Sequence, residues 1–267
     1  MIVNLHTHTA RCGHAVGTDR EYVETAITRG LTTLGFADHM PFVFPDGYES
    51  SFRIPMKLAE DYMMSLRTLR EEYKDQITIH IGFEIEYYPL YFKEMKQIAL
   101  NLGADFLLLS QHYIKNEHPN GSRYMGRGDH DEKELILYAD TVLEAMDMGI
   151  FTYFAHPELI RFTGKDRALY KKQMRRICRG AKEHELPLEI NLLGLREGRH
   201  YPIKQFWEIA AQEGCTVVFG SDAHSPDVVS DAESESIALD WVKELGLRYE
   251  PCPAIRNPRT GKITLTK

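Results

Sequence analysis

The chain has 267 residues, 43% of them apolar, and a formal net charge of −7 with a sequence pI of about 6.0. This suffices for one large domain or two small ones, and the acidic balance argues against nucleic acid as the main partner. No apolar run approaches the roughly 18 residues of a membrane span, and no signal-peptide pattern precedes Asn4, so we expect a cytoplasmic protein without membrane contact. The four cysteines lie far apart without a Cys-x-x-Cys pair, which argues against disulfides and against a cysteine zinc site.

Short apolar runs alternate with longer amphipathic runs along the chain. Such alternation is typical of βα units, which build a mainly parallel sheet. The predicted strands cover residues 2–6, 33–37, 78–85, 105–111, 151–155, 187–191 and 216–220. The predicted helices cover residues 19–29, 55–73, 90–100, 132–148, 167–185, 203–212 and 231–245. For a chain of this size we expect a single-domain α/β fold over residues 1–267, closed into a (β/α) barrel rather than doubly wound.

Two loops and the tail differ in composition from the rest of the chain. The loop over residues 41–54 is rich in Pro, Phe, Gly and Ser, and the polar loop over residues 114–131 follows the fourth strand. In a barrel both would lie at the C-terminal rim, where active sites are built. Residues 251–267 contain three prolines and a turn-like segment, so we expect a C-terminal surface extension that forms an edge hairpin.

Potential metal ligands follow six of the seven predicted strands. The carboxyl ends of parallel barrel strands meet at one mouth, so these side chains should converge. The candidates are His6, His8, His39, Glu84, His112, His156, Asp222 and His224, with His14 in the first loop. Imidazole and carboxylate without thiolate fit Zn, Mn or Fe in a hydrolytic site. Nine ligands are too many for one ion, so we expect two or three ions that clamp a bridging hydroxide and a phosphoryl group.

Other residues carry competing interpretations. Any one of the candidate histidines could be a hydrogen-bonded rim residue, and only the set as a whole argues for metal. Glu86 could orient a ligand, contact a cationic substrate or be solvated. Cys12 is given no role, and five histidines lack the strand-end position: His80, His118, His130, His184 and His200.

The motifs His6-Thr7-His8, Asp38-His39, Gly82-Phe83-Glu84, His112, His156-Pro157 and Asp222-Ala223-His224 resemble, in order and spacing, those of the polymerase and histidinol phosphatase (PHP) superfamily. The resemblance extends over nearly the whole chain. The segments Asn191-Leu192-Leu193-Gly194-Leu195-Arg196 and Tyr201-Pro202 resemble the histidinol-phosphate phosphatases within it. This resemblance implies a distorted (β/α)7 barrel with a trinuclear metal site.

The resemblance also implies a division of the ligands. It assigns His6, His8, Glu84 and Asp222 to a first metal, and Glu84 as a bridge with His112 and His156 to a second. His14, His39 and His224 are assigned to a third metal. Arg196 and Arg161 are expected to bind phosphate, because a guanidinium can contact it through two nitrogens, although each could be a surface arginine. Arg127 is a weaker candidate.

The implied activity is hydrolysis of a phosphomonoester, L-histidinol phosphate, in histidine biosynthesis. Glu84, Asp222 and His224 are the expected catalytic residues, and Asp222, His224 or a metal-bound water would protonate the leaving oxygen. Phe42, Phe44 and Phe52 could pack on the substrate ring or anchor their loop. A PHP-type 3′–5′ exonuclease, a nucleotide phosphodiesterase or phosphatase, and a non-catalytic metal store are the alternatives. The sequence leaves the oligomeric state open.

Overall fold

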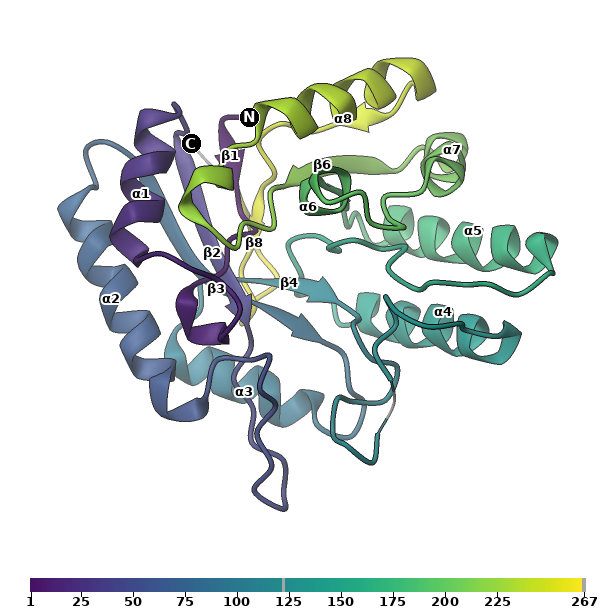
Figure 1. The fold of residues 1–267 in the computed structure, drawn as a ribbon, viewed down its shortest axis with the longest axis horizontal. Coiled ribbons are helices and arrows are strands. Elements are labelled where there is room, and N and C mark those ends of the chain that lie inside the picture. The colour runs from purple at the N-terminus through teal and green to yellow at the C-terminus, as the bar shows by residue number, and fades with distance from the viewer. Residues whose placement is uncertain (122, 266–267) are drawn as a thin grey trace.

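Two runs of parallel strands form the centre of the protein (Figure 1). In this computed structural model, which describes residues 1–121 and 123–265, the first run has the order β1-β2-β3-β4 and the second β5-β6-β7. The first consists of β1 (Val3–Asn4), β2 (Thr33–His39), β3 (Thr78–Glu86) and β4 (Phe106–Ser110). The second consists of β5 (Leu188–Asn191), β6 (Thr216–Gly220) and β7 (Arg248–Tyr249).

Single-residue bridges join these two runs into a distorted ring. Phe154 forms parallel bridges to Leu109 on β4 and to Leu188 on β5. Thr7 and Ala223 form the bridge on the other side, beyond β1 and β6. In place of the expected strand over residues 151–155, Phe154 alone forms both of these bridges. The predicted fold class, an α/β distorted barrel, is confirmed.

Helices surround the strands on the outside (Figure 1). In the described part of the chain, seven match the predicted helices: α1 (Asp19–Thr28), α2 (Ala59–Glu72), α3 (Phe92–Leu102), α4 (Glu132–Met146), α5 (Arg167–Glu183), α7 (Lys204–Glu213) and α8 (Ala232–Leu245). Thr18 and Asp131 begin α1 and α4 with capping boxes, which satisfy backbone N–H groups of the first turn. None of the helices in residues 1–121 and 123–265 combines the length and apolar content needed to cross a membrane.

The short helical elements were not predicted. They are α6 (Leu192–Arg196) and the 3₁₀ helices Ala10–Cys12, Met56–Leu58 and Pro226–Val228. Asn191 caps α6 by accepting a hydrogen bond from the Gly194 backbone nitrogen. These elements span too few residues to show a helical period in the sequence.

Apolar side chains fill both sides of the ring. The larger cluster lies between strands and helices, and a smaller one contains Val3, Leu5, Phe106, Val218 and Ile255. Ile255 belongs to the tail, where β8 (Ile255–Arg256) pairs antiparallel with β9 (Ile263–Thr264). The expected hairpin is therefore present. Most tail residues are exposed, but Ile255 is buried with side chains of four barrel strands, so the tail also packs into the fold.

Candidate metal centre

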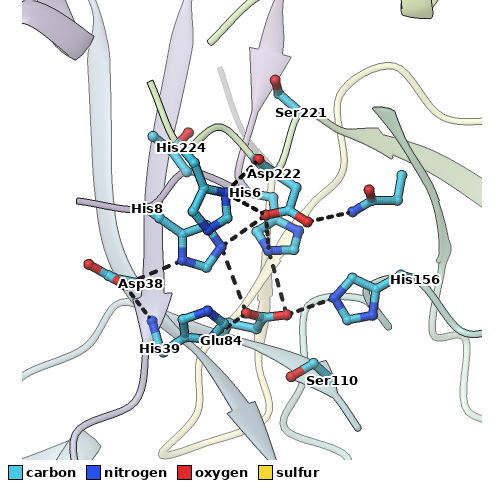
Figure 2. Close-up of polar contacts among 12 residues, drawn as sticks. His6, His8, Asp38, His39, Glu84, Ser110, His156, Ser221, Asp222 and His224 are labelled. Carbon is cyan, nitrogen blue, oxygen red and sulfur yellow. Dashed lines mark hydrogen bonds and ion pairs between the residues drawn. The ribbon is translucent and has the colours of Figure 1, made fainter. Parts of the chain in front are cut away.

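The nine candidate ligands gather at the carboxyl ends of the strands. Seven of them border a cavity of about 1080 Å³: His14, His39, Glu84, His112, His156, Asp222 and His224. His6 and His8 are fully buried and make contacts with Glu84 and Asp222 (Figure 2). The barrel thus brings together every ligand that the sequence placed at a strand end.

Glu84 and Asp222 each face the imidazoles of both His6 and His8. His6 Nε2 lies 3.6 Å from Glu84 Oε1 and 3.7 Å from Asp222 Oδ1. His8 Nε2 lies 3.8 Å from Glu84 Oε2 and 3.1 Å from Asp222 Oδ1. These four side chains are the set that the PHP resemblance assigned to the first metal.

Several buried atoms in this group lack a hydrogen-bond partner among the described residues. They are His6 Nε2, His8 Nε2, Glu84 Oε2 and Asp222 Oδ1. Buried polar atoms are almost always satisfied, so a cluster of unsatisfied nitrogens and oxygens that face one another requires another explanation. A metal ion would satisfy all of them, and the donor set fits the group that the resemblance implies.

The other two predicted groups flank the first. His156 Nε2 lies 2.9 Å and His112 Nε2 lies 3.6 Å from Glu84 Oε1, which places Glu84 between the first and second groups. The ring centroids of His14 lie 5.3 Å from His39 and 4.9 Å from His224. Ligand atoms of His8, His39 and His224 fall within 4.8 Å of one another. These clusters, the first two of which are buried, fit a multinuclear centre.

Oxygen atoms orient most of these imidazoles through Nδ1. His6 Nδ1 lies 2.7 Å from Glu189, His8 Nδ1 lies 3.3 Å from Asp38, and His112 Nδ1 lies 2.7 Å from Glu86. Backbone carbonyl oxygens take this role for His14 and His224. Such contacts fix the ring and leave Nε2 free for a metal.

Glu189 was missed by the sequence reasoning. It lies two residues before Asn191, so both face the same side of β5, and that alternation was the available signal. Glu86 contacts His112 and Arg53 and is fully buried, which rules out a solvated carboxylate and places it next to a predicted ligand. Cys12, which was given no role, has its sulfur within 4.8 Å of ligand atoms of His14 and His224.

The electrostatics of the centre are dominated by its carboxylates. Burial lowers the pKa of His6 and His8, but carboxylate contacts outweigh it and raise both, that of His8 to about 9. Burial raises the pKa of Glu84 and Asp222, but the surrounding histidines hold both well below their usual range. At His39 burial prevails and lowers the pKa to about 4. The ionised carboxylates thus form a site suited to cations.

Arginines border the cavity, but Arg196 is not among them. Its guanidinium donates to Asp231, at 2.9 Å, and to the Ser221 carbonyl oxygen, beside a separate hollow at the start of α8. This position speaks against the expected contact of Arg196 with phosphate, because α6 ends at this residue and directs it towards α8. The phosphate-binding role of Arg196 stays a prediction. Arg161 and Arg127 do border the cavity, and so does Arg199, which was not predicted.

Arg199 is held at the cavity wall by two neighbours. Its Nε donates to Glu197 at 2.8 Å, and its Nη1 donates to the Tyr201 hydroxyl at 2.8 Å. Arg161 is also exposed and donates to the Gly128 carbonyl oxygen. The cavity is thus bordered by carboxylates and imidazoles, which suit metal cations, and by guanidinium groups, which suit an anion.

Aromatic rings complete the wall of the cavity. Phe52 borders it and lies 4.5 Å from His39 between ring centroids, whereas Phe42 and Phe44 are buried in the core. His200, which lacked a strand-end position, also borders the cavity and contacts the Leu159 carbonyl oxygen. His118 and His184 form ion pairs away from it, with Asp46 and Asp147.

Known proteins share both the sequence pattern and the fold. The PHP domain model matches residues 4–192. A probable histidinol-phosphatase of Deinococcus radiodurans is 28% identical over 251 residues, 91% of this chain and 93% of the relative. Histidinol-phosphatase of Bacillus subtilis is 26% identical over 254 residues, 82% of this chain and 92% of the relative.

Among solved structures, the crystal structure of histidinol phosphate phosphatase from Lactococcus lactis complexed with zinc, L-histidinol and phosphate is similar. It has a TM-score of 0.72 and 21% sequence identity, and the alignment covers 99% of this chain and 98% of that one. This likeness shows the fold. Because the family model covers more than half of the chain, the chain belongs to the PHP family.

Proposed function

We propose that the chain is a metal-dependent phosphomonoesterase that hydrolyses L-histidinol phosphate to L-histidinol and phosphate, in the cytoplasm as part of histidine biosynthesis. The observation that carries the proposal is the cluster of buried ligand atoms without a hydrogen-bond partner among the described residues, next to a cavity bordered by arginines. The names of full-length relatives and the ligands of the Lactococcus lactis structure support the choice of substrate.

In this proposal each part of the cavity has one task. Two to three Zn, Fe or Mn ions would supply Lewis acidity and a nucleophile at neutral pH. Glu84 lies between two ligand groups and would bridge them. Arg161 and Arg199 would bind the phosphoryl oxygens and neutralise their charge. Asp222 and His224 border the same cavity, and the low pKa of each leaves it without a proton at neutral pH. They would therefore accept hydrogen bonds from a water that gives its proton to the leaving oxygen.

The aromatic wall would hold the leaving group. Phe52 and Tyr113 lie 5.8 Å apart between ring centroids, and both border the cavity. A flat imidazole ring packs well against such side chains. The loop over residues 41–54 thus contributes one aromatic residue, Phe52, to the substrate side, while Phe42 and Phe44 anchor the loop.

The experiment is turnover by purified protein after removal and return of metal. Chelation should abolish hydrolysis of L-histidinol phosphate, and Zn, Fe or Mn should restore it. The same preparation is tested with a nucleoside monophosphate and with single-stranded DNA, the substrates of the alternative functions. Full turnover by protein shown to be metal-free by elemental analysis, or faster turnover of either alternative substrate, would contradict the proposal.

A further inference from the structure

Arg53 is a buried arginine in the loop between β2 and α2 that the proposed function does not use. Only 1% of the residue is exposed. Its Nε donates to Glu117, one Nη donates to Glu86, and Nη1 donates to the Met40 carbonyl oxygen at 2.9 Å. The guanidinium therefore joins three segments: its own loop, the end of β3 and the loop after β4.

Through its contact with Glu86, Arg53 is connected to the predicted metal centre. Glu86 is fully buried and contacts Arg53 through Oε2 and His112 Nδ1 through Oε1, at 2.7 Å. The opposite nitrogen of the same ring, His112 Nε2, faces Glu84. Arg53, Glu86 and His112 thus form a continuous chain of polar contacts that ends at Glu84.

The residue before Arg53, Phe52, borders the cavity. The Arg53 guanidinium carbon lies 5.0 Å from the centroid of the Phe52 ring. The Phe52 ring lies 4.5 Å from His39 and 5.7 Å from His112 between centroids. One buried cation therefore fixes both the orientation of His112 and the position of the aromatic side chain beside it.

A role in stability alone explains this cluster poorly. Desolvation of a buried ion pair commonly cancels its Coulombic attraction, so such clusters add little to stability compared with apolar side chains of similar volume. The cluster also contains two carboxylates for one guanidinium. Its location behind a predicted metal ligand gives it a different use, because groups behind a ligand tune metal affinity.

We propose that Arg53 is a positioning residue for the second metal, the one predicted at His112 and His156, and that it acts through Glu86 while Glu117 holds it in place. This inference rests on one part of the proposed function, the presence of the metal centre. It does not depend on the identity of the substrate. Without Arg53, Glu86 can turn away from His112, whose ring then loses its fixed orientation.

The experiment measures metal content and metal affinity rather than activity. Wild type, Arg53→Lys, Arg53→Met and Glu86→Gln are loaded with Zn, analysed for metal per chain and titrated with a chelator. Lysine keeps the charge but cannot span both carboxylates, and glutamine keeps the shape of Glu86. Each variant should bind one equivalent about 10- to 100-fold more weakly than wild type, with the remaining equivalents unchanged.

Arg175→Met is the matched control. Arg175 also joins two elements through a carboxylate, with its Nε 2.8 Å from Glu213, but it lies away from the cavity on α5. This variant should keep every metal equivalent at wild-type affinity. For Arg53→Lys, turnover should return at high metal concentration, which a purely structural defect would not show.

Three results would overturn the inference. Wild-type metal content and affinity in both Arg53→Lys and Glu86→Gln would show that the contact chain does not position the metal. An equal weakening of every equivalent would indicate general damage to the fold. If Arg53→Met does not fold, Arg53→Lys and Glu86→Gln decide the outcome. A wild-type protein that binds no metal would overturn the metal centre itself, and with it the proposed function.

Discussion

The position of His6 depends on Glu189 and, behind it, on Gly220. Glu189 contacts His6 Nδ1 and accepts hydrogen bonds from the His156 backbone nitrogen and the Asn191 side chain. Gly220 lies on the neighbouring strand β6, where a Cβ atom would stand 1.7 Å from Glu189 Oε1. Only glycine leaves room for the carboxylate that orients His6.

Gly220→Ala should therefore weaken metal binding at the first group. The added methyl displaces Glu189, His6 loses its Nδ1 partner, and metal affinity falls by about 10- to 100-fold. Chelator titration of the loaded protein measures this. Gly180→Ala is the control, because its Cβ would meet the flexible Leu143 side chain on α4 instead. Both variants should lose about 1–3 kcal/mol of stability, but Gly180→Ala should retain wild-type metal affinity.

The arginines provide a second prediction at the same scale. Arg199→Ala should lower kcat/KM for the phosphate ester by about 10- to 100-fold, because a charge-assisted hydrogen bond to the anion is lost. Arg196→Ala should change kcat/KM by less than about 2-fold, since its partner is Asp231, and should alter stability by about 0–1 kcal/mol. Steady-state kinetics of the two variants tests both statements. The opposite ranking would restore the original assignment of Arg196.

Strand-end position is a sequence property, so eight of the nine ligands could be predicted from it, with His14 added from the first loop. The structure brings all nine together, although their metal roles stay predictions. Arg199 and Glu189 could not be found in the same way. The direction of Arg199 depends on the turn after α6, and the use of Glu189 depends on its neighbour His6, about 180 positions earlier in the chain.

At the scale of elements, long periodic segments were predicted well and short ones were not. The seven long helices and most strands follow from their hydrophobic period. The segment over residues 151–155 reads as a strand, but the ring is distorted there and Phe154 alone forms the bridges. The packing of the tail could not be predicted, because Ile255 is buried among residues of strands that are distant in the sequence. A local sequence pattern contains no information on such a contact.

Ile255→Ala should destabilise the protein by about 2–5 kcal/mol, because it removes a buried side chain from the interior of the barrel. Denaturant unfolding measures the change. Ile263→Ala is the control on the other strand of the same hairpin, where the side chain is 53% exposed, and it should stay within about 0.5 kcal/mol of wild type. Equal effects of the two variants would show that the hairpin acts as a surface extension.

At the scale of the whole molecule, predicted ligands lie on both sides of two of the single-residue bridges that complete the ring. His112 follows β4 and His156 follows Phe154, so they lie on the two sides of the bridge between Leu109 and Phe154. His6 and His8 face Asp222 and His224 across the bridge between Thr7 and Ala223. Metal ions held by these residues would strengthen the ring at places where the backbone pairing is shortest.

Removal of metal should therefore lower the stability of the whole barrel. A ligand that binds only the folded state at about 100 times its dissociation constant adds about 2.7 kcal/mol, which corresponds to a Tm shift of roughly 5–10 °C for a chain of this length. Thermal unfolding followed by circular dichroism, before and after chelation and after return of metal, measures the shift. The Tm of His8→Ala should fall less on chelation, because the variant lacks one ligand of the first group. The barrel itself should stay folded, because this residue lies at a strand end. Identical Tm values with and without metal in the wild-type protein would contradict a stabilising role of the metal centre.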